Sequence, residues 1–76
     1  MKTFSRIELN PSIMGGKPCI KGARVTVGTI VGLIASGASF ENILKDYPYL
    51  NNGDIIEALE YAAWRTSEIE VELEPA

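Results

Sequence analysis

Residues 15–27 have the sequence GGKPCIKGARVTV, which places three glycines and three cationic side chains in front of an apolar run. This composition could serve a phosphate-binding loop, a contact with a nucleic-acid backbone, or a turn of the chain. A phosphate-binding loop requires the pattern G-x-x-x-x-G-K-[ST], but Lys17 is followed by Pro18 and no glycine stands at the first position. No G-x-G-x-x-G pattern opens a helix either. The glycines therefore favour turns over phosphate chemistry.

Few residues in the sequence are suited to catalysis or metal binding. The chain contains no histidine, the most common general base near neutral pH. Its one cysteine, Cys19, has no histidine to activate it and precedes Ile20, so we expect a small buried apolar residue. One cysteine without any histidine also disfavours a zinc site. The sequence predicts no enzyme, no metal site and no cofactor.

The cysteine count and the apolar runs indicate the cellular location. A single cysteine cannot form a disulfide within the chain, which fits a reducing cytosol. The first ten residues, MKTFSRIELN, contain no apolar segment of the kind found in signal peptides. The most apolar run, Val25–Ala38, is shorter than the roughly 20 residues that a membrane-spanning helix needs. We expect a cytoplasmic protein with no membrane contact.

Charge is divided unequally along the 76 residues, whose formal net charge is −3. Residues 1–38 hold five cations and one acid, a net charge of +4. Residues 39–76 hold two cations and nine acids, a net charge of −7. Such a division is typical of a chain with two different partners, or of two halves that contact each other across a dimer.

The sequence predicts short extended segments near the N-terminus. Residues 4–9 have the composition of a strand, with Ile7 and Leu9 on one face. Residues 19–20 and 24–27 are two further extended pieces, separated by a turn that a lysine and a glycine form.

Capping residues mark the first two of three expected helices. Thr26 precedes a helix over residues 27–36, which Gly37 ends. Ser39 begins the second helix, which Pro48 ends. Apolar residues recur at helical spacing in both, at Val27, Ile30, Val31 and Ile34 and again at Phe40, Ile43, Leu44 and Tyr47.

The third helix has the clearest start signal. Asn51 as the N-cap places Asp54 at the third helical position, a variant of the capping box, and Leu50 and Ile55 form an apolar staple beside it. One face of this helix carries the expected core residues Ile55, Ala58, Leu59 and Ala62. The opposite face carries Gly53, Glu57, Glu60 and Trp64.

Residues 68–74, with the sequence EIEVELE, alternate strictly between acidic and apolar side chains. This period of two is typical of an amphipathic strand. We therefore expect a single, mainly α domain with a C-terminal strand. It consists of a basic, turn-rich β arm over residues 1–26, a three-helix core with a helix-turn-helix outline over residues 27–65, and an acidic strand-like tail over residues 66–76.

The helix-turn-helix outline over residues 39–64 indicates DNA binding, with the third helix in the major groove. Asn51 and Asn52 on that helix carry amides that pair well with adenine edges. Glu57 and Glu60 would instead oppose a phosphate backbone, and a three-helix core without a nucleic-acid role explains the pattern equally well. If DNA is bound, we expect the phosphate contacts from the cations of the arm, Lys17, Lys21 and Arg24. The alternative is that these cations pair with the protein's own acidic tail.

Trp64 and the tail are the candidates for a protein contact. Trp64 points away from the core stripe of its helix, so another surface must cover it. The apolar face of the tail is one such surface, and a partner protein is another. A tail that pairs with residues 4–9, within the chain or across a homodimer, is the simpler interpretation. The candidate partner-binding residues are Trp64, Glu68, Ile69, Glu70, Val71, Glu72 and Leu73.

Three pieces of the sequence, NPSIMGGKPCIKGAR, GASFENILKDYPYL and DIIEALEYAAW, together resemble a known family. Over residues 6–64 the chain is similar to the small prokaryotic family of domains of unknown function that is numbered four hundred and thirty-three. Ala23 departs from the family, which usually has threonine there. The resemblance implies a homeodomain-like three-helix fold and no catalytic residues. It also implies an antitoxin that pairs with a PIN-like ribonuclease toxin, binds its own operator as a dimer, and blocks the toxin with a C-terminal segment.

The leading hypothesis is therefore a cytoplasmic, dimeric, antitoxin-like regulator that binds operator DNA and docks a PIN-like toxin with its acidic tail. The alternative hypothesis is a protein-interaction or homodimerisation module with no DNA role, which the acidic side chains of the third helix favour.

Overall fold

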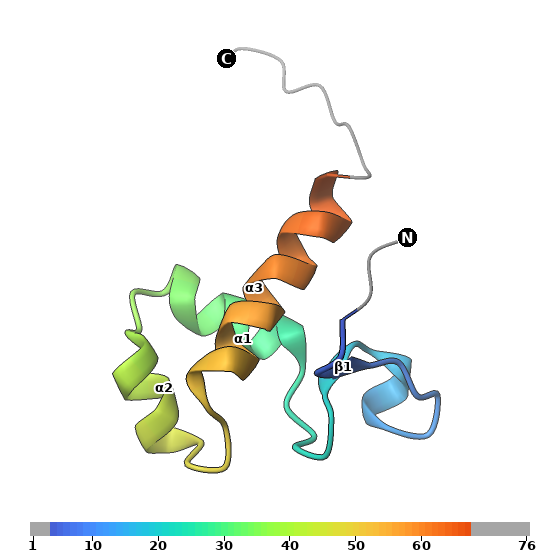
Figure 1. The fold of residues 1–76 in the computed structure, drawn as a ribbon, viewed down its shortest axis with the longest axis horizontal. Helices are drawn as coiled ribbons and strands as arrows, with labels where there is room; N and C mark the ends of the chain where they lie inside the picture. Colours follow the sequence, from blue (N-terminus) through green and yellow to red (C-terminus); the bar gives the residue numbers. More distant parts are fainter. Residues whose placement is uncertain (1–3, 68–76) are drawn as a thin grey trace.

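The computed structural model of the protein describes residues 4–67. Its described part contains a small two-stranded sheet followed by three helices (Figure 1). The elements in chain order are β1 (Ile7–Glu8), the 3-10 turn η1 (Met14–Gly16), β2 (Cys19–Ile20), α1 (Val27–Ala35), α2 (Phe40–Asp46) and α3 (Asn52–Ser67). The prediction of a mainly α, three-helix domain with short N-terminal β segments is confirmed, whereas the expected C-terminal strand lies outside the described residues.

The sheet is shorter than the sequence predicted. β1 pairs with β2 in antiparallel register, with Ile7 opposite Ile20 and Glu8 opposite Cys19. The expected strand over residues 4–9 is therefore wrong in length, because the chain turns before residue 7 and turns again after Leu9. Ile7 is buried, but Leu9 is 63% exposed and does not join it in the core.

The glycines of the basic arm lie in turns, as expected. Gly15, Gly16 and Gly22 all have positive φ angles, of 66°, 82° and 75°. This left-handed region favours glycine because it has no Cβ atom. The turn after β2 closes when the Ile20 N–H donates to the carbonyl of Val25. The predicted extended piece at 19–20 is β2, but the one over residues 24–27 is shorter than expected, because Arg24 has a φ of 54° and α1 begins at Val27.

The caps of α1 and α2 are those that the sequence predicts. The Thr26 side chain accepts from the Thr29 N–H at the start of α1, and Gly37 follows α1 with a φ of 97°. Ser39 and Asn42 form a reciprocal capping box at the start of α2. These local bonds satisfy backbone groups that a helix end otherwise leaves without a partner.

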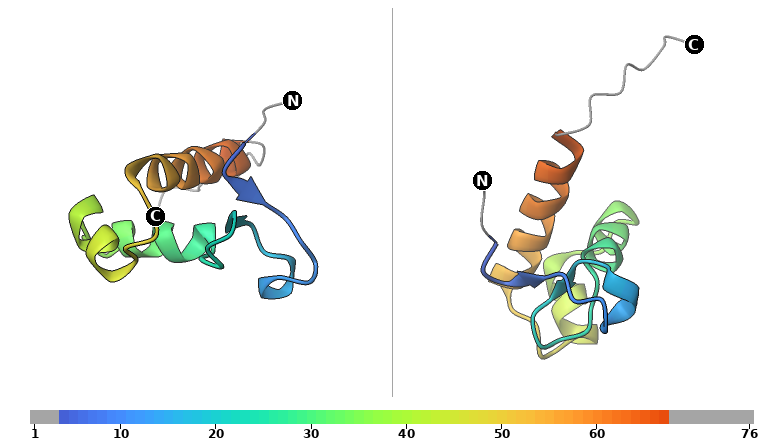
Figure 2. Two further views of the ribbon diagram at one scale, coloured as in Figure 1. Left: turned by 60° about the horizontal axis from the view of Figure 1, so that its bottom comes forward. Right: turned by 90° about the vertical axis from the view of Figure 1, so that its right-hand side faces the viewer.

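The core lies where α1 packs against α3, and α2 contacts both helices at one end (Figures 1 and 2). Each helix contributes one fully buried isoleucine, namely Ile30, Ile43 and Ile55. Leu50, the expected staple residue, is also buried. Beneath the sheet the core is completed by Ile7, Cys19, Ile20, Val25 and Val27. In the part of the chain from residue 4 to residue 67, no helix is long and apolar enough to cross a membrane.

Candidate functional site

Arg6, just before β1, lies against the face of α3 that carries Gly53 and Glu57. The Arg6 guanidinium Nη1 is 3.2 Å from a carboxylate oxygen of Asp54 and 3.2 Å from the side-chain oxygen of Asn51. The Arg6 backbone N–H donates to the Glu57 carboxylate. A Cβ atom added at Gly53 would stand only 2.8 Å from Arg6 Cζ. Arg6 therefore covers the start of α3 beside Gly53, whereas Asn52, Ile56 and Glu60 of this helix are exposed.

The capping box at the start of α3 holds Arg6 in place. The Asn51 N–H donates to Asp54 at 3.0 Å, and the Asp54 N–H donates to the Asn51 side-chain oxygen at 3.0 Å. Asp54 is 8% exposed, and its carboxylate meets both a cation and a backbone N–H. The Asn51 oxygen is thus engaged in a cap and a contact with Arg6, whereas Asn52 on the next position is exposed.

Three aromatic rings form a cluster along the second half of α3. Phe4 packs edge-on against Tyr61, with ring centroids 5.2 Å apart. Trp64 lies 5.6 Å from Phe4 and 5.8 Å from Tyr61. Tyr61 is buried, a core position that the predicted stripe missed. The prediction that another surface must cover Trp64 is met in part by Phe4, which sequence reasoning did not single out.

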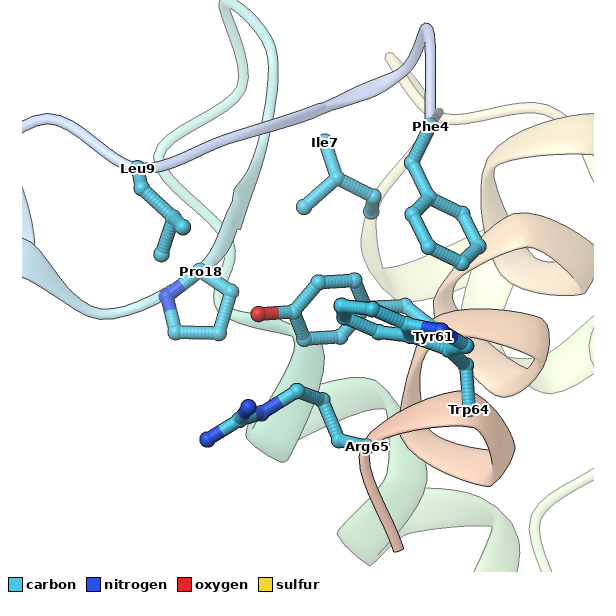
Figure 3. A pocket seen from close by; sticks show the side chains of 7 residues that line it. All are labelled: Phe4, Ile7, Leu9, Pro18, Tyr61, Trp64 and Arg65. Atoms are coloured by element: carbon cyan, nitrogen blue, oxygen red, sulfur yellow. The ribbon is translucent and has the colours of Figure 1, made fainter. Parts of the chain in front are cut away.

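An apolar groove opens beside this aromatic cluster. It has a volume of about 680 Å³ and lies between the sheet and the end of α3 (Figure 3). Most of its lining side chains are apolar or aromatic, and the lining residues are Phe4, Ile7, Leu9, Pro18, Tyr61, Trp64 and Arg65. Figure 3 shows Leu9 and Pro18 on one side of the groove and the rings of Tyr61 and Trp64 on the other.

The predicted phosphate-contacting cations are exposed on the turn-rich arm. Lys21 and Arg24 flank the turn after β2, and Lys17 lies just before β2. Within residues 4–67 the one ion pair is that between Arg6 and Asp54, so none of the three predicted cations has an acidic partner there. Lys17 also lines a hollow of about 440 Å³ at the start of α1, together with Pro18, Thr26, Gly28 and Thr29.

Cys19 behaves as a small apolar residue. It is 1% exposed, and its thiol donates to the carbonyl of Lys17 at 3.2 Å. Among the residues that the structure describes, no three His, Cys, Asp or Glu side chains gather in a group that could hold a metal ion. The predicted partner-binding residues of the tail, Glu68, Ile69, Glu70, Val71, Glu72 and Leu73, lie outside the described residues.

Comparison with known proteins identifies the family. Residues 7–62 match the family described as "Protein of unknown function (DUF433)", so the chain belongs to this family. The resemblance in sequence is thereby confirmed. The chain is 38% identical over 56 residues to the uncharacterized protein y4eO of Sinorhizobium fredii (strain NBRC 101917 / NGR234), a match that covers 74% of this chain and 25% of that protein.

A solved structure shares the fold. The crystal structure of a DUF433 member protein from Anabaena variabilis (ATCC 29413) matches with a TM-score of 0.77 and 28% sequence identity. The match covers 83% of this chain and 62% of that chain. This chain thus spans about a quarter of the curated relative and less than two thirds of the solved one.

Proposed function

We propose that the protein is the antitoxin-like component of a toxin–antitoxin pair, which binds operator DNA as a dimer and a PIN-like ribonuclease toxin through its acidic tail. One observation carries the proposal: the arm exposes three cations, Lys17, Lys21 and Arg24, that have no acidic partner within residues 4–67. Residues 4–67 hold six cations and six acids, whereas residues 68–74 hold four acids and no cation. The two ends of the chain therefore suit partners of opposite charge.

The arm contributes contacts with the DNA backbone. Lysine and arginine side chains that neutralise phosphates supply most of the sequence-independent affinity for DNA. Lys17 stands beside the first turn of α1 in the hollow that Gly28 and Thr29 also line. The N–H groups of Val27, Thr29 and Ile30 at this helix start already donate to Pro18 and Thr26, so the phosphate contact rests on the lysine.

α3 is the recognition helix of this proposal. Asp54 near its start pairs with the Arg6 guanidinium, which reduces the repulsion that this carboxylate would exert on a phosphate, whereas Glu57 accepts only the neutral backbone N–H of Arg6 and keeps its charge. Asn52 remains exposed on the first turn, the part of a recognition helix that contacts base edges in helix-turn-helix proteins. Glu60 is exposed further along α3, so in a complex its carboxylate must lie away from the DNA phosphates.

The tail contributes the toxin contact. Its glutamates at positions 68, 70, 72 and 74 complement a ribonuclease cleft that is basic because it binds RNA. The toxin itself is proposed only by its chemistry, as a small ribonuclease with a basic substrate cleft.

Salt-dependent binding of the protein to the DNA upstream of its own gene tests the DNA half of the proposal. The logarithm of the binding constant falls linearly with the logarithm of the salt concentration, with a slope of about −0.9 per neutralised phosphate. If each of the three cations contacts one phosphate, the variant Lys17→Ala/Lys21→Ala/Arg24→Ala should have a slope that is smaller in magnitude by about 2.7. Fluorescence anisotropy with labelled DNA measures this slope.

The matched control is Lys45→Ala, which removes an exposed cation of α2 that lies outside the arm. We expect it to leave the slope unchanged. DNA binding through the arm would be ruled out if the unmodified protein bound no DNA at low salt. It would also be ruled out if the triple variant had the slope of the unmodified protein.

A protein-interaction or homodimerisation module with no DNA role is the second candidate. Ile56 is 48% exposed and Glu60 follows one turn later on α3. An apolar side chain beside an acid suits a protein surface better than a phosphate backbone. This candidate predicts that a variant without residues 66–76 keeps its helices and loses its partner, and that no variant shows salt-dependent DNA binding.

A further inference from the structure

The groove beside the aromatic cluster has an apolar lining that the described residues leave open. The register of the sheet brings Leu9 opposite Pro18, one pair beyond the residues of β1 and β2. Leu9 is 63% exposed although it faces this concave surface (Figure 3). Apolar area in such a place gains free energy when another apolar side chain removes it from water.

The lining defines the chemistry of an occupant. Six of its seven residues are apolar or aromatic, and Arg65 supplies one cation. An occupant with apolar side chains on one face and polar side chains on the other matches this lining, because its apolar face leaves water while its polar face keeps its contact with water. Residues 68–74, EIEVELE, have this alternation.

The position of this segment in the chain also fits. Ser67, the last residue of α3, comes three residues after Trp64, which lines the groove. At a rise of 1.5 Å per residue, the helix ends about 5 Å beyond Trp64 along its axis. Five extended residues, 69–73, span about 17 Å. Ser67 thus lies close to the groove, and a reversal of the chain after α3 would bring the following residues across it.

We propose that the protein's own residues 69–73 dock in this groove as an extended strand, with Ile69, Val71 and Leu73 inward. The groove belongs to the segment of the same chain rather than of a second copy, because so short a tether holds the segment at an effective concentration in the millimolar range. Docked in this way, Glu70 and Glu72 face outward, where a basic partner reaches them. The inference does not depend on the proposed function, since neither DNA nor toxin takes part in it.

Trp64 is the only tryptophan of the chain, so its fluorescence reports directly on the groove. The test compares two double variants of the full chain, Ile69→Ser/Val71→Ser and Glu70→Ser/Glu72→Ser. Both introduce two serines, but only the first removes the inward face. We expect the emission of the first variant to shift to longer wavelength and its quenching by acrylamide to increase. The second variant should match the unmodified protein, and circular dichroism should show the same helix content in all three.

A change on the groove side separates docking from a direct effect on the ring. Leu9→Ser should produce a similar emission shift by itself, because it removes an apolar side chain from the groove. Leu9 is exposed, so its loss does not disturb the core. In the Ile69→Ser/Val71→Ser background it should add little, since the two changes remove the same contact. Fully additive shifts would contradict docking, as would identical emission from both double variants.

The same fluorescence, followed over a hundredfold dilution beside sedimentation analysis, identifies the occupant. Docking within the chain predicts emission that is independent of concentration. An emission shift that accompanies the dissociation of a dimer would assign the groove to the segment of a second copy and overturn the proposal.

Discussion

Asp54 joins the start of α3 to the N-terminal segment. Its replacement by alanine should therefore lower the free energy of unfolding by more than the small size of the side chain implies. The carboxylate accepts the Asn51 N–H at 3.0 Å and is 3.2 Å from Arg6 Nη1. Loss of the capping-box bond costs about 1 kcal/mol. Loss of a negative charge in the first turn of a helix costs about 0.5 kcal/mol.

The ion pair adds a smaller contribution. The Arg6 side chain is 44% exposed, whereas that of Asp54 is 11% exposed. Water therefore screens the pair, and its loss costs about 0.5 kcal/mol. The three contributions together predict that Asp54→Ala lowers the free energy of unfolding by about 2 kcal/mol. For a domain of this size, that corresponds to a fall in Tm of about 8–16 °C.

Urea unfolding followed by circular dichroism measures this change. Asp46→Ala is the matched control, because Asp46 is an exposed acid at the last position of α2. An acid at a helix C-terminus contributes no favourable dipole interaction, so the control should change stability by less than about 0.5 kcal/mol. Asp54→Asn keeps an acceptor oxygen but loses the charge, and should cost about 1 kcal/mol. Equal stability of Asp54→Ala and Asp46→Ala would refute the reasoning.

Two further predictions concern neighbouring or similar residues in different environments. Ile55→Ala should lower the free energy of unfolding in urea by about 2–5 kcal/mol, because Ile55 is 0% exposed. Ile56→Ala should lower it by less than about 1 kcal/mol, because Ile56 is 48% exposed. Equal losses would contradict the packing of α3. Gly32→Ala should raise the thermal midpoint through a gain of up to about 1 kcal/mol, since it lies in α1 with open space around it. Gly37→Ala should lower the thermal midpoint through a loss of about 1–2 kcal/mol in the free energy of unfolding, because the φ of Gly37 is 97°. A higher midpoint for Gly37→Ala would contradict the left-handed conformation of Gly37.

The sequence predicted the helices well because their start signals are local. Thr26, Ser39 and Asn51 each bond to a backbone N–H only three residues further along the chain. The type and spacing of the residues therefore determine the cap almost independently of the rest of the fold. Turn glycines are predictable for the same reason, since positive φ is a property of a single residue.

The contacts that Phe4 and Arg6 make with α3 could not be predicted from such local signals. Arg6 and Asp54 are 48 residues apart in the chain, and Phe4 reaches Trp64 over a still longer separation. No periodic pattern connects such pairs, because tertiary packing alone brings them together. Gly53 carried a faint signal, since a glycine in the first turn of a helix permits the close approach that Arg6 makes.

The candidate site was therefore predicted in composition and only partly in geometry. Lys17, Lys21 and Arg24 are exposed on the arm as proposed for a phosphate contact. Glu57, expected to oppose DNA from an open helix face, instead accepts the Arg6 N–H. Glu57 and Glu60 keep their charges in the folded chain, because the guanidinium of Arg6 pairs with Asp54 and not with them.

Inhibition of a co-purifying ribonuclease tests the antitoxin proposal most directly. The tagged protein is purified from its native host beside the variant in which Glu68, Glu70, Glu72 and Glu74 are replaced by glutamine, and both preparations are assayed for RNA cleavage. The account predicts an equimolar small ribonuclease with the unmodified protein, silent in the complex and active once the protein is removed, and a weakened complex with the variant. A homodimer without a ribonuclease, or a co-purifying ribonuclease that the protein does not inhibit, would contradict the account.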